Sequence, residues 1–245
     1  TSNVVSTFKA GRDITRQASG TITDQGTQLE AGRDIKQSAT TVKEIVAEDK
    51  TWSKESSEQH DARVGVYAGA SAKAGASSQA GALGTAAEVK AEAEASAGLK
   101  GKYTYEKSSN ESSSATAVTS RYKAGGSISS TSTDKTTLIG TQFEAGKDVT
   151  IEAKSLDYQA ARDTTSSLSG KQSAEAEAKA KLVGTAGAEL SGAYDQNTSS
   201  SSSSTARAGG INAGGNVTVR TRDDARFEGT DISAGEKAKV ESTKG

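Results

Sequence analysis

The chain has 245 residues without cysteine, proline or methionine, and its 30 basic residues nearly balance 31 acidic ones. The lack of cysteine excludes disulfides and thiolate metal sites, and the near-neutral charge gives no electrostatic case for binding nucleic acid or an anionic membrane. No run of 18 apolar residues predicts a transmembrane helix. No signal peptide opens the sequence, which is typical of a fragment or a mature segment.

The apolar content is low for a globular protein. Leu, Ile, Val and Phe together account for 33 of the 245 residues. Below roughly 20%, a chain often cannot offset the entropy of folding and stays disordered. Composition therefore leaves two possibilities: a largely disordered secreted passenger, or a fold that buries little per residue and is stabilised by repetition.

A repeated phrase favours the second possibility. "GTQLEAGRDI" at 26–35 returns as "GTQFEAGKDV" at 140–149 and "GTDISAGEKA" at 229–238. A period of about 21 residues fits one coil of a β-helix, in which we expect glycine to supply the positive-φ positions of tight turns. A phosphate-binding loop is the alternative, but neither G-x-x-x-x-G-K-[ST] nor G-x-G-x-x-G before a helix is present. The shorter word Ala-Gly-x-x-apolar occurs in three pairs that all have this same internal spacing, at the predicted turn glycines Gly11, Gly32, Gly125, Gly146, Gly214 and Gly235.

Within each predicted coil the apolar residues alternate with polar ones, which is the periodicity of a strand. Stacking the coils would align these side chains into continuous ladders, and the missing proline fits because proline removes a ladder donor. The predicted core ladder consists of Ile14, Ile22, Leu29, Ile35, Ile128, Leu138, Phe143, Val149, Ile151, Val217, Val219, Phe227 and Ile232.

Two inserts interrupt the coils. We expect coils at 1–49, 119–163 and 208–245, and inserts at 50–118 and 164–207. Alanine and glutamate favour a helix, so a helix is the alternative for words such as "AEAEAKAKL". However, strict alternation gives one apolar face on a strand and none on a helix. Each insert is therefore predicted to be an antiparallel hairpin with arms of about 20 residues, turning near 83–86 and 183–186, and both hairpins should leave from the same side.

Candidate catalytic residues are few. His60 is the only histidine, so Ser-His-Asp catalysis would have to pass through it, yet its surroundings "SSEQHDAR" are typical of a solvated strand. The alternative function is that of a β-helix protein that binds or degrades a polysaccharide. The pair Asp223 and Asp224 could serve such degradation, but nothing distinguishes the pair from solvated charges. We expect no catalytic residue and no cofactor.

Aspartates that recur after the turn glycine raise the question of calcium. Asp13, Asp34 and Asp148 share this position, which Ser127, Asn216 and Lys237 occupy in the other coils. Lysine cannot bind calcium, so we predict a local turn-forming role and no metal.

Aromatic residues are concentrated in the inserts. Cross-strand packing is the simpler expectation for them, and surface binding the alternative. They are Trp52, Tyr67, Tyr103, Tyr105 and Tyr194.

The words "AGRDI", "AGKDVTIEA" and "AGGNVTV", with Ser/Ala/Gly-rich inserts and "TARAGG", resemble the haemagglutinin repeats of filamentous-haemagglutinin-type exoproteins. That group includes the toxin carriers of contact-dependent growth inhibition. The resemblance implies an all-β, right-handed parallel β-helix, secreted by the two-partner route through an outer-membrane pore to the surface of a Gram-negative bacterium. Implied partners are a target-cell surface, outer membrane or receptor, and no nucleic acid or small-molecule substrate. The chain would be a slice of a longer array, from an adhesin or a toxin carrier.

Overall fold

The computed structural model describes residues 2, 5–81, 84–183 and 186–244, and for 71–94 the backbone alone. Within these ranges all regular structure is β-strand, and no helix is present that could cross a membrane. The predicted hairpin turns at 83–86 and 183–186 fall partly outside the described residues. The described residues form two compact units, one of 1–53, 112–167 and 201–245, the other of 54–111 and 168–200.

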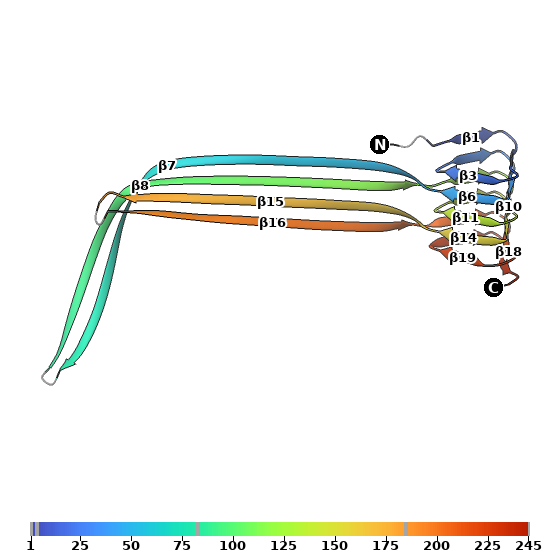
Figure 1. Cartoon of the computed structure of the whole chain (residues 1–245). Helices are drawn as coiled ribbons and strands as arrows, with labels where there is room; N and C mark the ends of the chain where they lie inside the picture. Colours follow the sequence, from blue (N-terminus) through green and yellow to red (C-terminus); the bar gives the residue numbers. More distant parts are fainter. Residues whose placement is uncertain (1, 3–4, 82–83, 184–185, 245) are drawn as a thin grey trace. The chain divides into compact units, whose positions relative to one another are not determined.

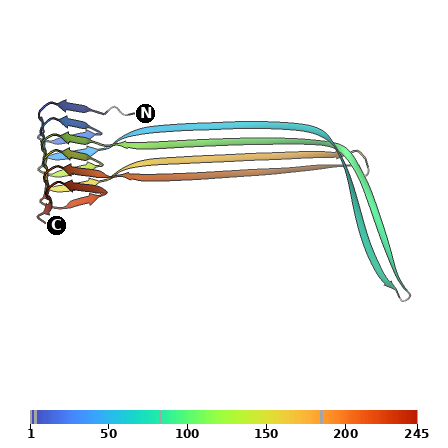
Figure 2. The same ribbon diagram turned by 180° about the vertical axis from the view of Figure 1, so that it is seen from behind.

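Short strands of the first unit form three parallel sheets, and each coil adds one strand to each sheet in turn (Figures 1 and 2). The first sheet contains β1 (Thr7–Ala10), β4 (Gln28–Ala31), β9 (Arg121–Ala124), β12 (Gln142–Ala145), β17 (Gly209–Ala213) and β20 (Thr230–Ala234). The second contains β2 (Ile14–Gln17), β5 (Ile35–Ala39), β10 (Ile128–Ser132), β13 (Val149–Ala153), β18 (Val217–Thr221) and β21 (Ala238–Ser242). The third contains β3 (Thr21–Gln25), β6 (Thr41–Ile45), β11 (Lys135–Ile139), β14 (Ser155–Gln159) and β19 (Ala225–Glu228).

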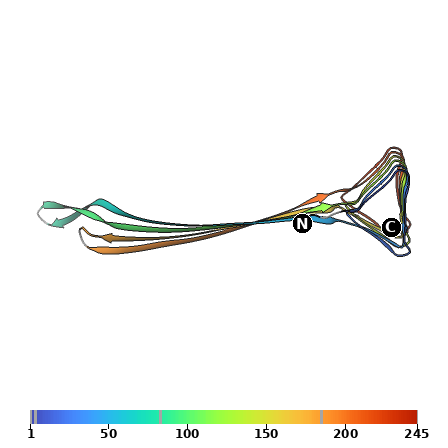
Figure 3. The ribbon, with the colours of Figure 1, turned by 90° about the horizontal axis from the view of Figure 1, so that it is seen from above.

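Equivalent residues of successive coils lie side by side. Ile14 pairs with Ile35, which pairs with Ile128, and Ile128 pairs with Val149. In the first and second sheets this register repeats with every coil and continues across the inserts, so residues that are equivalent in the sequence repeat also pair in the structure. In the third sheet the pairs with no insert between them are 20 residues apart, as for Ile22 and Val42. Seen along the stack, the coils outline a triangle (Figure 3). The predicted parallel β-helix, with one sequence repeat per coil, is confirmed.

Alternate residues of each short strand point inward and form the core. Most residues of the predicted ladder are buried, but Ile14, Phe227 and Ile232 are only partly buried because they lie in the outermost coils. Further core residues lie at the same inward parity but outside the predicted ladder, among them two tyrosines: Val42, Tyr122, Leu156, Tyr158 and Ile211.

The Ala-Gly glycines form a column, and their role differs from the predicted one. None of the six has a positive φ. Instead, the five that follow Gly11 each stack on the glycine of the preceding coil so closely that a side chain would not fit. A Cβ at Gly125 would lie 2.4 Å from the carbonyl oxygen of Gly32, and one at Gly146 would lie 2.3 Å from that of Gly125. Close approach of the backbone, not turn conformation, is therefore the reason for glycine at Gly32, Gly125, Gly146, Gly214 and Gly235. A Cβ at Gly11, at the open end of the column, would meet nothing within 4 Å.

The positive-φ glycines belong to the Gly-Thr phrase. Gly26, Gly140 and Gly229 have φ values of 65°, 62° and 59°. Each follows a strand of the third sheet and leads into a strand of the first sheet. At these corners only glycine adopts the required conformation without strain.

The inserts replace this corner in every second coil. The first is β7 (Ala47–Gly81) with β8 (Gly84–Val118), between β6 and β9. The second is β15 (Ala161–Lys181) with β16 (Gly187–Arg207), between β14 and β17. Both inserts are strands rather than helices. The arms of the first hairpin have 35 residues, more than the expected 20, because pairing continues through the Ser/Thr tracts.

Candidate interaction surface

The bases of both hairpins join in one sheet, with the strand order β16-β15-β8-β7. Hydroxyl groups pair across neighbouring strands on one face of it. Thr51 bonds Ser114 at 2.6 Å, Thr165 bonds Ser203 at 2.6 Å, and Ser53 bonds Ser112 at 2.7 Å. Residue numbers rise on one strand as they fall on its partner, so the strands are antiparallel. The Ser/Thr tracts are therefore cross-strand ladders.

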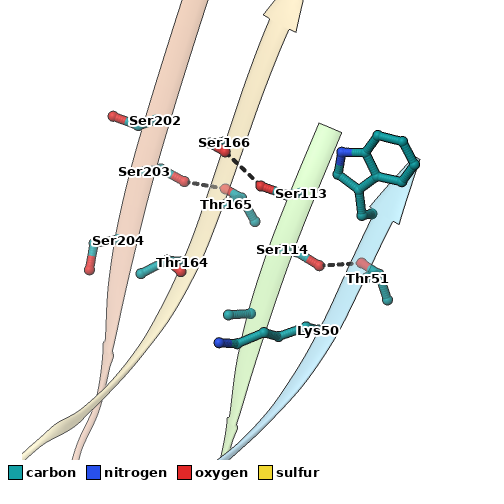
Figure 4. Close-up of a pocket in the computed structure, with 12 residues that line it drawn as sticks. Lys50, Thr51, Ser113, Ser114, Thr164, Thr165, Ser166, Ser202, Ser203 and Ser204 are labelled. Carbon is teal, nitrogen blue, oxygen red and sulfur yellow. Dashed lines mark hydrogen bonds between the residues drawn. The ribbon is translucent and has the colours of Figure 1, made fainter. Parts of the chain in front are cut away.

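The opposite face of this four-stranded sheet carries the side chains that alternate with these hydroxyl residues along each strand. Ser113 and Ser166 bond each other there at 2.7 Å. Because pairing is antiparallel and side chains alternate, Trp52 lies beside Ser113, and Ser202 lies beside Ser166. An open groove of about 700 Å³ crosses all four strands (Figure 4). It is lined by Lys50, Thr51, Trp52, Ser113, Ser114, Ala115, Thr164, Thr165, Ser166, Ser202, Ser203 and Ser204.

Trp52 is 67% exposed, so the expected cross-strand packing does not hold for it. Its cationic neighbour in the groove, Lys50, forms an ion pair with Glu48 at 3.0 Å. The groove therefore presents an exposed indole beside a floor of hydroxyl groups and carries little net charge.

Asp163 holds the two hairpins together at the coil surface. Its Oδ2 accepts a hydrogen bond from Arg207 Nε on β16 at 2.8 Å, and its Oδ1 accepts one from the Ala117 amide on β8 at 2.7 Å. The bond from Arg207, with that from Ala117, holds the pKa of Asp163 below its usual range. The carboxylate is thus ionised at neutral pH and links three adjacent strands.

The second unit contains the outer parts of the hairpins and has two unlike faces. On one, Lys100 pairs with Glu177 and Lys102 pairs with Glu175, each at 2.8 Å. The bond from Lys100, with that from Lys179, lowers the pKa of Glu177 to about 2. Charged side chains of this face therefore satisfy one another across the strands.

Alternation places apolar side chains on the other face of the second unit. Here Val64 is 85% exposed, Val66 84% and Leu190 81%. The same parity includes Leu99, Tyr103, Leu182 and Tyr194, which are also exposed. Nothing in the described part of the chain covers this face.

His60 lies within an aromatic cluster of the second unit. Its Nδ1 is 2.7 Å from the Tyr103 hydroxyl, and its ring is tilted against Tyr105 with centroids 4.9 Å apart. These contacts fit the expected cross-strand packing of both tyrosines. No serine or carboxylate hydrogen bond to His60 is present among the described residues.

Asp223 and Asp224 lie in the bend between β18 and β19. Their backbone groups join neighbouring coils: the Asp223 amide donates to Lys154, and the Asp224 carbonyl accepts from Leu156. The Asp223 carboxylate lies 3.6 Å from Lys244 Nζ. The described residues contain no group of three or more His, Cys, Asp or Glu that could hold a metal ion.

The recurring aspartates act between coils, and the predicted local turn role is wrong for them. Asp34 Oδ1 accepts a hydrogen bond from the Ser127 amide at 2.9 Å. Asp148 Oδ1 accepts one from the Asn216 amide at 2.8 Å, which lowers the pKa of Asp148. Asp13 accepts bonds from the Arg33 side chain and the Asp34 amide. Each carboxylate thus caps the backbone of the next coil.

A polar cluster lies inside the first three coils, and none of its residues is among the predicted site residues. Arg16 donates to Asp24 at 2.6 Å, and the Tyr122 hydroxyl donates to the same carboxylate oxygen at 2.7 Å. Glu44 is fully buried and hydrogen-bonded to the Tyr122 hydroxyl. Gln37 donates to Ser130 at 2.9 Å. The alternation itself signals this cluster, since Asp24 and Glu44 each follow an inward-facing residue by two positions.

The two buried carboxyl groups have opposite protonation states. Burial and the charge of Asp24 raise the pKa of Glu44 to about 8. Burial alone would raise the pKa of Asp24, but hydrogen bonds from Arg16 and Tyr122 outweigh it and the pKa lies below its usual value. At neutral pH, Glu44 is therefore a neutral acid beside an ionised Asp24 that is paired with Arg16.

Comparison with known proteins agrees with this architecture. The family model described as hemagglutinin repeat matches residues 101–244, more than half of the chain. No curated protein and no solved structure matches the chain. The chain therefore belongs to the hemagglutinin-repeat family, a structural family of secreted, adhesin-like β-helical exoproteins rather than of enzymes.

Proposed function

We propose that this chain is a segment of a large exoprotein at the surface of a Gram-negative bacterium, exported by the two-partner route. The β-helix is a scaffold, and the hairpins are displayed for contact with a target cell. The outer parts of the hairpins associate with the outer membrane of that cell. Adhesion and contact-dependent toxin delivery are the two settings in which such a segment would act.

The observation that carries the proposal is the uncovered apolar face of the second unit. Large apolar residues such as Val64, Val66 and Leu190 are more than 80% exposed there. Soluble monomers rarely expose a large contiguous apolar patch unless it contacts a partner or a membrane. The opposite face has its charges paired, as in the Lys100–Glu177 bridge. One apolar and one charged face suit a sheet lying against lipid.

The scaffold role follows from the way the hairpins join the coils. In the first coil, which has no insert, Gly26 and Thr27 connect the third sheet to the first. Thr27 is buried, as are its structural equivalents Ser120 and Thr141. A hairpin thus replaces a corner without altering the strands on either side. We expect a variant with Gly-Thr in place of 46–120 and Gly-Gly in place of 160–209 to keep the β-helix. The second site needs glycine at both positions because a Cβ at Gly209 would lie 2.3 Å from the Tyr158 ring.

Flotation with liposomes of phosphatidylethanolamine and phosphatidylglycerol tests the membrane contact. The wild-type chain should float with the liposomes, and the variant without hairpins should not. Val66→Asp with Leu190→Asp should abolish flotation, because two charges would enter the lipid-facing side. The control Glu189→Lys changes an exposed residue next to Leu190 but on the charged face, and should float. Wild-type protein that stays in the dense fraction, or a double variant that floats equally well, would refute the proposal.

A further inference from the structure

The groove at the base of the hairpins has an unusual chemical composition. Nine of its twelve lining residues are serine or threonine. The remaining three are Lys50, Trp52 and Ala115, and Trp52 is the only tryptophan of the chain. By alternation, only five of these nine have side chains on the groove face: Ser113, Thr164, Ser166, Ser202 and Ser204. The other four belong to the hydroxyl ladder on the opposite face. The groove face therefore combines five hydroxyl groups with one large aromatic ring on the edge strand β7.

Trp52 is not required by the hairpin repeat. Asp49 and Asp163 occupy equivalent positions in the two repeats, at the same distance along the chain from Gly32 and Gly146. Three positions later the first hairpin has Trp52 and the second has Ser166. The described residues include no ring that stacks on the indole, whose exposure of 67% leaves it in water. Tryptophan is enriched at binding interfaces, so an exposed indole at the edge of a groove is suited to contact a ligand.

The lining chemistry narrows the class of ligand. The groove is short of large apolar side chains, so it would not hold a lipid tail or a hydrophobic drug-like molecule. It also lacks the cluster of cations that a phosphate backbone needs, since Lys50 is already paired with Glu48. Hydroxyl groups together with one exposed aromatic ring match a ligand that combines many hydroxyl groups with flat apolar patches. Saccharides have this chemistry.

We propose that this groove binds a neutral oligosaccharide chain of the target-cell surface, with one sugar ring stacked on Trp52. Further sugars would lie across the strands over Ser113, Ser166 and Ser202. With strands about 4.8 Å apart, the row from Trp52 to Ser202 crosses three strand spacings and is roughly 14 Å long. Ser113 and Ser166 already share one hydrogen bond, but a hydroxyl group has one donor and two acceptor sites, so the pair retains hydrogen-bonding capacity for a sugar. The inference rests on the proposed function because it supplies one chemical means of cell contact.

The single tryptophan makes a direct test possible, because intrinsic tryptophan fluorescence reports on Trp52 alone. The purified chain is titrated with neutral oligosaccharides of glucose, galactose, mannose and N-acetylglucosamine. With at least one of them, we expect a saturable blue shift and protection of the indole from acrylamide quenching. A fluorescence signal that none of these sugars changes saturably would overturn the proposal.

Calorimetry with the binding sugar extends the test to variants. Trp52→Ala should weaken binding by ~10-fold or more, whereas Trp52→Phe should keep most of it because a ring remains. Tyr194→Ala removes another exposed aromatic residue, in the second unit, and should leave binding unchanged. Equal affinity of wild type and Trp52→Ala would contradict the proposal.

Failure of this inference is distinguishable from failure of the proposed function. The liposomes contain no sugar, so flotation depends on the outer hairpin face and not on the groove. Trp52→Ala should float like wild type. Wild-type protein that floats but binds no sugar would remove the saccharide site and leave the membrane contact in place.

Discussion

Replacing Glu44 by glutamine should change the pH dependence of stability. In the folded chain Glu44 has a pKa of about 8, because it is buried beside the charge of Asp24, whereas its ordinary value is 4.5. As pH rises from about 4.5 to 8, the unfolded chain loses this proton while the folded chain retains it. The stability contributed by the neutral acid is therefore complete below pH 4.5 and is lost progressively up to pH 8.

The size of this effect follows from the difference between the two pKa values. Each pH unit is worth about 1.4 kcal/mol, so the free energy of unfolding falls by at most about 5 kcal/mol over this window. Glutamine does not titrate. Glu44→Gln should therefore be close to wild type near pH 4.5 and more stable than wild type at pH 8, with no further change in the difference above that.

Urea unfolding followed by circular dichroism at pH 4.5, 6, 7, 8 and 9 measures this difference. Glu144→Gln is the control, because Glu144 points outward and pairs with Arg121. That variant should show no comparable trend between pH 6 and 8. A difference between wild type and Glu44→Gln that stays constant across the series would refute the reasoning, because it would mean that Glu44 titrates alike in the folded and unfolded chains.

Four further variants test the scaffold. Gly146→Ala should destabilise the chain by about 2–3 kcal/mol, because the new Cβ would meet the Gly125 carbonyl. Gly11→Ala is the control and should be neutral, because a Cβ at Gly11 has nothing within 4 Å. Equal melting temperatures of the two variants would contradict the glycine column. Asp148→Ala should cost roughly 1 kcal/mol through the lost Asn216 bonds. Because the pKa of Asp148 is lowered, its contribution is present above the unfolded pKa and lost as pH falls through the folded pKa, so wild type and variant should converge in acid unfolding curves. Replacing the first hairpin by Gly-Thr and the second by Gly-Gly should leave a β-rich circular dichroism spectrum and cooperative melting. Loss of either would show that the coils depend on the hairpins.

Much of the fold could be predicted from periodicity. The constant spacing between Gly11 and Gly32, and between Gly125 and Gly146, is local information, and it was enough to give the coil length and register. Alternation at Val64 and Val66 separated strand from helix for the first insert. These inferences succeeded because they depend only on spacing along the chain.

Roles that depend on the neighbouring coil could not be predicted in this way. Gly125 requires glycine because of Gly32, which is 93 residues earlier, and Asp34 caps Ser127 across the same interval. A sequence word shows that glycine recurs, but not whether a positive φ or a close approach is the cause. The groove is equally hidden, since it needs the pairing of β8 with β15, which no single segment contains.

The placement of one hairpin in every second coil has a geometric consequence. Two coils advance by two strand spacings along the stack, roughly 9.6 Å, and one hairpin adds two strands of the same spacing to its own sheet. The stack of coils and the hairpin sheet therefore lengthen by the same distance with each repeat. A unit of two coils and one hairpin could be duplicated or removed during evolution without shearing the hairpin sheet away from the coils. The length of the scaffold and the number of displayed strands would then change together, in fixed proportion.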